Sequence, residues 1–410
     1  MWLAWSVRRL SAGSAPAFGN PSSAPVRGQP FDSAGGEAHT ERMRVESDDP
    51  VALALSAEGA QRRQRACMPS QPVRVGLLLN PRAGRARNPR MRTELQGLLD
   101  GPDAWAETWD LGSVRRALAV LLCQRRANVL AIAGGDGTVH HVVNALVDLT
   151  TETALLTGEP VPMPRVLILN GGTLNIVGRT CAIHGPPQEI LGKFLQFFAG
   201  APLSRVPARR LPLLEVAWRQ GDAPVAMRYG FVFGSEVAYH AIELYERFGA
   251  GYLGLARFLA ELTRGILWGS ELWQREGWKL GPFADGLLVD GVHYPTYTGV
   301  AASTVDLTLA IGAAAAVRRR LYQPGFSARV VQALDPKTII GLVPAMMADR
   351  PVAGLDDYPT VRQLRLFGPY TLDGELFHEP AHAPHRLPLT VAISEQRLQA
   401  VPGEWTAEDW

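Results

Sequence analysis

The segment VLAIAGGDGTVHHVVNALVDL, residues 129–149, places a strand pattern, a glycine-rich turn and a helix pattern in direct succession. Its apolar start, 129–133, is typical of a buried strand, and apolar residues recur at helical spacing through 139–149. The glycines around Asp136 allow close approach of the backbone to a ligand, and free N–H groups at a helix N-terminus suit phosphate. The segment therefore predicts a phosphate-binding turn that carries one carboxylate.

Two other apolar runs end in similar turns. Residues 73–79 are followed by NPRAGR, and residues 165–169 by NGGTLN. Each turn alone is also compatible with a simple helix or turn cap. Ligands collect beyond the carboxyl ends of the strands in an open α/β sheet, so three such turns together predict a nucleotide-binding cradle.

Strand and helix patterns alternate across residues 71–200, which predicts a doubly wound α/β domain with a parallel sheet. We expect residues 150–164, rich in Thr and Pro, to be a connection. The predicted strands are 73–79, 104–111, 129–133 and 166–169, and the predicted helices are 90–99, 113–126, 139–149 and 187–198.

The alternation of strand and helix patterns ends at about residue 200. Prolines in 201–212 predict a linker, and short apolar runs separated by turns predict a β-rich domain over 213–402. An apolar stripe at helical spacing from Tyr245 to Ile266 predicts one long helix within this domain. We expect it to pack on the strands, although its aromatic residues would also suit a lipid cleft or a membrane surface.

Residues 1–70 show little apolar periodicity and are rich in Ser, Ala, Gly, Pro and Arg. We expect them to be disordered, or to be a mis-called extension with the true start at Met43 or Met68.

The net charge, the cysteines and the apolar runs limit the partners and the cell compartment that the sequence allows. The formal net charge of the 410 residues is +2, which predicts no nucleic-acid partner. The three cysteines form no CxxC pair, which fits a reducing cytoplasm. The weakly polar run 307–317 is too short to span a bilayer, so membrane contact is expected only at the periphery, at the inner membrane surface. Nothing in the sequence indicates an oligomeric state.

The motifs NPRAGR, GGDGTVHHVVNAL and LNGGTLN resemble the nucleotide-binding motifs of the diacylglycerol kinase catalytic-domain family, which includes bacterial lipid kinases and sphingosine kinases. A fourth stretch, TLDGEL at 371–376, is similar to the DGE motif of that family. The resemblance spans about residues 72–402 and implies an NAD-kinase-like α/β domain followed by a β-sandwich-like domain. It also implies a kinase of lipid metabolism or phospholipid biosynthesis.

This resemblance implies ATP and Mg²⁺ as cofactors and a lipid as phosphate acceptor. Phosphoryl transfer requires bound phosphates, charge neutralisation and an oriented hydroxyl. Asp136 and Glu375 are the predicted catalytic carboxylates, with Glu375 as base for the lipid hydroxyl; the metal ligands are left open. The predicted nucleotide-binding residues are Asn80, Gly84, Gly134, Gly135, Gly137, Thr138, Gly171, Gly172, Thr173 and Asn175.

One position departs from the family pattern, because His141 stands where the family commonly has Glu. An imidazole cannot hold a cation as a carboxylate does, so a non-catalytic nucleotide- or lipid-binding relative is one alternative function. An NAD-kinase-like enzyme acting on a soluble substrate is another, since GGDGT is shared with that class. The acceptor, whether diacylglycerol, a sphingoid base or another lipid alcohol, is not readable from the sequence.

Overall fold

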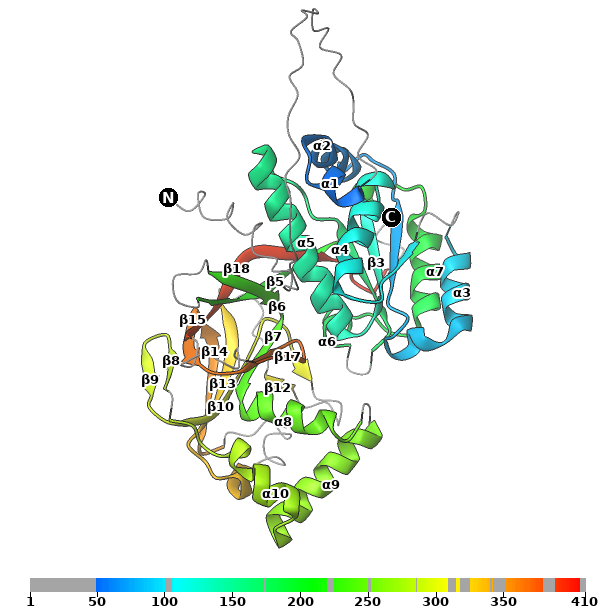
Figure 1. Cartoon of the computed structure of the whole chain (residues 1–410). Coiled ribbons are helices and arrows are strands. Elements are labelled where there is room, and N and C mark those ends of the chain that lie inside the picture. Colours follow the sequence, from blue (N-terminus) through cyan, green and yellow to red (C-terminus); the bar gives the residue numbers. More distant parts are fainter. Residues whose placement is uncertain are drawn as a thin grey trace, which may run out of the picture.

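The computed structural model describes residues 49–99, 105–172, 175–219, 225–249, 252–284, 286–308, 315–317, 325–339, 341, 352–378 and 388–405. Figure 1 shows an α/β region built mainly from the first half of the chain and a sheet-rich region below it. The helices are α1 (Pro50–Ala54), α2 (Ala57–Ala66), α3 (Pro89–Gly97), α4 (Leu111–Ala119), α5 (Asp136–Thr157), α6 (Ile176–Thr180), α7 (Pro187–Phe198), α8 (Val237–Glu246), α9 (Tyr252–Trp268) and α10 (Glu271–Glu276).

The α/β region contains four parallel strands in the order β2-β1-β3-β4. Helices α4 and α5 cover one face of this sheet, and α3 and α7 cover the other (Figure 1). The predicted alternation of strands and helices around a parallel sheet is therefore confirmed. These strands are β1 (Val75–Leu79), β2 (Trp105–Glu107), β3 (Val129–Gly134) and β4 (Arg165–Asn170).

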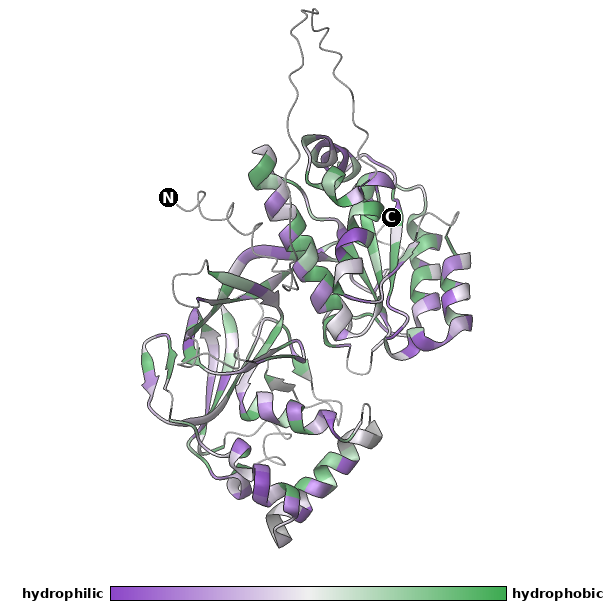
Figure 2. Cartoon of the chain, viewed as in Figure 1, coloured by the Kyte–Doolittle hydropathy of each residue, from purple (hydrophilic) through white to green (hydrophobic). Residues whose placement is uncertain are grey.

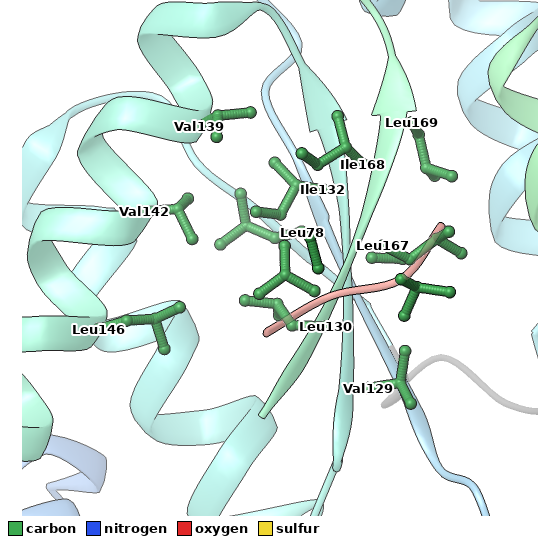
Figure 3. Packing of buried hydrophobic residues seen from close by; sticks show 14 of the residues in the cluster. Leu78, Val129, Leu130, Ile132, Val139, Val142, Leu146, Leu167, Ile168 and Leu169 are labelled. Carbon is green, nitrogen blue, oxygen red and sulfur yellow. The ribbon is translucent and has the colours of Figure 1, made fainter. Parts of the chain in front are cut away.

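Apolar packing holds the central strand and the helix that follows it. Every residue of β3 is buried. Figure 3 shows Val139, Val142 and Leu146 of α5 directed toward the sheet, where Leu130 and Ile132 lie. Full burial of such a side chain contributes about 1.5–3 kcal/mol. The turn between β3 and α5 thus connects two tightly packed elements.

Helix α5 is longer than predicted, because it runs through residues 150–157 of the expected connection. Thr150, Thr153 and Thr157 each donate their hydroxyl to a carbonyl one turn earlier, at 2.6, 2.6 and 2.8 Å. Local bonding of this kind makes Thr compatible with a helix that tertiary packing stabilises. The helix ends at Gly158, which has a φ of 72°.

The sheet-rich region confirms the predicted change to β-structure after residue 212. One six-stranded antiparallel sheet has the order β14-β13-β10-β7-β16-β17. Strands β5, β6, β8, β9, β15 and β18 lie opposite it, and buried side chains of both groups form one apolar cluster. The strands are β5 (Arg209–Trp218), β6 (Ala226–Gly230), β7 (Val232–Glu236), β8 (Leu287–Val289), β9 (Val292–Tyr294), β10 (Tyr297–Ser303), β11 (Leu307–Thr308), β12 (Ala315–Val317), β13 (Phe326–Gln332), β14 (Leu355–Val361), β15 (Gln363–Phe367), β16 (Tyr370–Leu372), β17 (Glu375–Phe377) and β18 (Pro388–Ala400).

The last strand connects the two regions. Strand β18 pairs with β5 and β15 in the sheet-rich region, and its last residue, Ala400, pairs in parallel with Val166 of β4. One ten-stranded sheet therefore runs through both regions. The predicted linker 201–212 is wrong for residues 209–212, which form the start of β5.

The prediction that residues 1–70 lack structure is wrong for residues 49–70; residues 1–48 lie outside the described part of the chain. Asp49 and Ser56 accept N–H groups at the starts of α1 and α2. The buried Arg63 of α2 donates to Thr153 Oγ1 of α5 at 2.6 Å and to the Ala54 carbonyl at 3.3 Å. Apolar periodicity missed α2 because its buried face consists of small residues and one arginine.

The single long helix predicted from Tyr245 to Ile266 is also wrong. The chain forms α8 and α9 instead, and Gly249 after α8 has a φ of 86°. Leu244 of α8, Phe258 of α9 and Leu280 form a small apolar cluster. Tyr245, Phe248 and Leu262 of the predicted stripe pack against this cluster, so part of the stripe is core, as expected. Among the described residues, no helix is long and apolar enough to cross a membrane.

A chain that starts at Met68 is expected to unfold at a lower temperature than one that starts at Asp49. The shorter chain lacks α1 and α2 and leaves Thr153 without the guanidinium of Arg63. Loss of each kcal/mol lowers the melting temperature by about 2–4 °C in a domain of this size. Thermal unfolding followed by circular dichroism measures the difference, and equal midpoints would contradict a stabilising role for these helices.

Candidate active site

The three predicted turns meet beyond the carboxyl ends of β1, β3 and β4. The Arg85 N–H donates to the Gly171 carbonyl at 2.9 Å, and the Gly171 N–H donates to the Gly134 carbonyl at 3.1 Å. The Asn80 N–H donates to the Ala133 carbonyl at 3.0 Å. The turns therefore form one continuous layer of backbone at the edge of the sheet.

Glycine is required in this layer because the turns pack backbone against backbone. A Cβ on Gly84 would lie 2.1 Å from the Gly171 carbonyl oxygen, and a Cβ on Gly172 would lie 2.6 Å from the Cα of Gly135. Gly134 likewise has no room for a side chain beside Thr138. Packing of the turns thus explains these glycines.

Polar side chains fix the shape of the turns. Asn80 Nδ2 donates to the hydroxyl of the buried Thr138 at 2.9 Å. Asn175 has a φ of 47°, and its amide group exchanges two hydrogen bonds with the backbone of Gly172, at 2.9 and 2.8 Å. The side chains of Asn80, Thr138 and Asn175, all predicted to bind nucleotide, therefore hold the turns in shape. Thr173 lies outside the described residues.

Asp136 begins α5 and connects two turns. Its Oδ1 accepts the N–H of Ile176, the first residue of α6, at 2.8 Å. Burial raises the pKa of Asp136 to about 6, with a smaller contribution from the nearby Asp373, although backbone hydrogen bonds oppose the shift. The carboxyl group thus titrates unusually close to neutral pH.

The DGE stretch forms a two-residue hairpin turn between β16 and β17, in which Asp373 and Gly374 have φ values of 56° and 89°. Asp-Gly is a favoured pair in two-residue hairpin turns, because a turn of this kind needs positive φ at both residues. Asp373 Oδ1 accepts the N–H groups of Phe231 and Val232 at 2.8 and 2.9 Å. Its Oδ2 lies 3.0 Å from Nδ1 of His140, a fully buried residue of α5. Asp373 therefore attaches the hairpin both to β7 of the sheet-rich region and to α5 of the α/β region.

This attachment places Glu375 over the first turn of α5. A Cβ on Gly137 would lie 2.2 Å from Glu375 Oε1, so a side chain there would force the carboxylate to move. The structure thus brings Glu375 to the same helix N-terminus as Asp136, as the prediction of a shared site required. Their catalytic roles stay predictions.

His141, the departure from the family pattern, faces this carboxylate. Its Nε2 lies 3.6 Å from Glu375 Oε2, and both side chains are partly exposed. The interaction with His141 is the main reason why the pKa of Glu375 is lowered. The histidine therefore favours an ionised Glu375.

Two residues that fix the site were missed in the sequence. His140 and Asn144, four residues apart, lie on the same face of α5. Asn144 donates to the Tyr229 carbonyl at 2.7 Å and accepts the Tyr229 N–H at 2.9 Å, which ties β6 to the helix. The four-residue spacing of these polar side chains, just after GGDGT, could have indicated a shared polar face of the helix. It could not identify their partners, Asp373 and Tyr229, which lie far away in the sequence.

A cavity of about 550 Å³ lies beside the first turn. Arg85 and Arg87 line it together with Gly84, and residues 186–188 form its other side. The two arginines were not predicted as ligands. They add positive charge next to the turns.

Comparisons with known proteins agree with this geometry. Residues 74–198, which contain all three turns, match the family model of the diacylglycerol kinase catalytic domain. The resemblance inferred from the motifs is therefore confirmed for this segment. A search of curated proteins found no significant match.

The fold is similar to that of solved structures from Bacillus anthracis str. Sterne. A candidate diacylglycerol kinase is 13% identical with a TM-score of 0.51, and the match covers 82% of this chain and 98% of that chain. A second structure, described as a diacylglycerol kinase, is 14% identical with a TM-score of 0.49, over 80% of this chain and 96% of that chain. At this identity the first likeness shows a shared fold.

Replacement of Gly137 by Ala is expected to displace Glu375 while leaving the fold intact. Alanine is favoured over glycine in a helix by about 0.5–1 kcal/mol, so stability should be unchanged or slightly higher. Misplacement of a reacting group by about 1 Å can cost roughly 10²-fold in rate. Turnover and melting temperature are to be measured together, with Gly97→Ala as control, since a Cβ there meets nothing within 4 Å. Normal turnover of Gly137→Ala would exclude a role for the Glu375 position.

The raised pKa of Asp136 predicts that the free energy of unfolding depends on pH through this residue. The folded state binds this proton more tightly than the unfolded chain, whose carboxyl has a pKa of 3.8. Asp136 therefore stabilises the fold most below about pH 4, and this contribution is lost as the pH rises through about 6. The Asp136→Asn variant should match the wild type at pH 4 and exceed its unfolding free energy at pH 8 by about 1–3 kcal/mol. Urea titrations at both pH values measure it, and a pH-independent difference would contradict it.

Proposed function

We propose that the protein is an ATP-dependent lipid kinase that transfers the γ-phosphate to a hydroxyl of a lipid such as diacylglycerol or a sphingoid base. The observation that carries this proposal is the position of Glu375. It lies against the N-terminus of α5, beside the three glycine-rich turns, where the first N–H groups of the helix have no partner within the helix and no side-chain cap. A nucleotide held by the turns and a hydroxyl held at Glu375 would then meet at one helix end.

In the proposed reaction Glu375 accepts the proton of the lipid hydroxyl, and the hydroxyl oxygen bonds to the γ-phosphorus of ATP. The bond between the γ-phosphorus and the oxygen that bridges it to the β-phosphate breaks, and ADP leaves. Contact with His141 keeps Glu375 ionised before the transfer. Arg85 and Arg87 beside the first turn would neutralise phosphate charge. The turns themselves orient the phosphates through backbone N–H groups.

The residues present fit a magnesium ion that is held mainly by substrate. Among the described residues, no three His, Cys, Asp or Glu side chains lie close enough to form a metal cage. Mg²⁺ usually needs only one or two carboxylates together with phosphates and water. Asp136, which uses Oδ1 for the N–H of Ile176, would offer its second oxygen. When bound, the ion would neutralise charge on the transferred phosphoryl group.

A lipid acceptor also requires access to a membrane surface. Trp268 at the end of α9 and Trp278 after α10 are 76% and 64% exposed. Helices α9 and α10 form the tip of the molecule farthest from the α/β region, and α9 carries apolar residues along part of its length (Figure 2). Tryptophan is favoured at bilayer interfaces because its ring is apolar and its N–H is polar. These features support peripheral contact of this tip with a membrane.

The test is transfer of radiolabelled γ-phosphate to a panel of lipid alcohols in detergent micelles, with NAD as a soluble acceptor. Glu375→Gln should lower turnover about 10²–10⁴-fold and leave nucleotide affinity nearly unchanged, because the amide cannot take the proton. Glu395→Gln, the same change at an exposed carboxylate of β18, is the matched control. Transfer to NAD alone would indicate the NAD-kinase-like alternative. Nucleotide binding without transfer to any acceptor would indicate a non-catalytic relative.

A further inference from the structure

The opposite edge of the parallel sheet holds a pocket that the proposed kinase reaction does not use. Its volume is about 70 Å³. Four arginines line it, and we call it the arginine pocket: Arg62 and Arg65 from α2, Arg74 just before β1, and Arg126 just before β3. No carboxylate belongs to the lining.

One buried side chain forms a rigid base for this pocket. Asn128 Oδ1 accepts the N–H of Arg74 at 2.9 Å. Its Nδ2 donates to the carbonyls of Ala66 and Pro72, both at 2.9 Å. The end of α2, the segment before β1 and the start of β3 are thus bound together. The backbone segments that present the arginines therefore keep a fixed relative position.

The charge in the pocket is only partly compensated. Arg62 pairs with Glu58 at 2.6 Å. Within the described part of the chain, the guanidinium groups of Arg65, Arg74 and Arg126 make no hydrogen bond or ion pair with the protein. The C-terminus of α2 attracts positive charge, but this effect is small at an exposed helix end.

Arg126 is the least expected of the four. Its φ of 57° lies in the left-handed region, which favours glycine over a long side chain. The chain therefore keeps an arginine at a strained position, where its guanidinium has no partner among the residues that the structure describes. A ligand that binds the guanidinium would account for both observations.

We propose that the arginine pocket binds a phosphate dianion, either free inorganic phosphate or a phosphate monoester. Guanidinium groups form paired, charge-assisted hydrogen bonds with phosphate oxygens, and several of them together select a doubly charged group. The pocket lies about 17 Å from the glycine-rich turns, because β1 and β3 separate the two and each residue of a strand spans about 3.3 Å. The pocket is therefore separate in space from the proposed nucleotide site.

Calorimetric titration of the full chain with inorganic phosphate and with glycerol 3-phosphate, at constant ionic strength, tests this site. We expect saturable binding to the wild type. Affinity should be about tenfold lower or worse in Arg126→Gly and lower still in Arg74→Gln/Arg126→Gly, since each charge-assisted bond contributes substantially. Arg365→Gln, which removes an exposed arginine of β15, should bind as the wild type does. Because Arg126→Gly relieves backbone strain, its melting temperature without phosphate should not fall, which separates lost binding from misfolding.

A second arm distinguishes the source of the phosphate. Sedimentation with phosphatidylcholine vesicles, with and without phosphatidic acid, is measured for the same proteins. Binding to phosphatidic acid that depends on the arginines, without binding of free phosphate, supports a lipid headgroup as ligand. Arginine-dependent binding of free phosphate alone supports a soluble ligand. Equal affinities of wild type and double variant in both arms, or no binding in either, would overturn the proposal.

Discussion

The contact between His140 and Asp373 is the interaction on which the candidate site depends. Both side chains are almost completely buried, and Asp373 also accepts two backbone N–H groups of the second region. Loss of either partner would leave a buried polar or charged group unsatisfied, which is costly. The contact fixes the hairpin on α5, and only this arrangement places Glu375 beside Gly137. The continuous strand β18 gives the same two regions a common sheet, so the alignment does not rest on one contact.

The candidate site contains several features that lower the stability of the isolated protein. Asp136 is held in surroundings that favour its uncharged form. Asn175 and Asp373 adopt positive φ values of 47° and 56°. Non-glycine residues in such conformations are strained and gather at functional sites. Their location around the turns and the hairpin agrees with a site that is shaped for a ligand.

The two edges of the parallel sheet differ in their electrostatics. At the carboxyl edge, the N-terminus of the long helix α5 presents N–H dipoles, and Arg85 and Arg87 add positive charge beside the first turn. At the amino edge, arginines with no protein partner among the described residues provide full charges.

The amino-acid sequence by itself determined the local elements. An apolar run, GGDGT and helical periodicity predicted β3, its turn and the start of α5, and the same signals found the turns after β1 and β4. The sequence did not determine α2, the full length of α5 or the break between α8 and α9, because packing partners decide whether a polar or threonine-rich segment becomes helical. The sequence motifs identified Glu375 and Asp136 as candidate residues but could not show that the two lie close together. Their meeting depends on contacts between residues more than 200 positions apart, such as His140 with Asp373. Pairing at that separation leaves no periodic pattern in the sequence, so only the tertiary structure decided it.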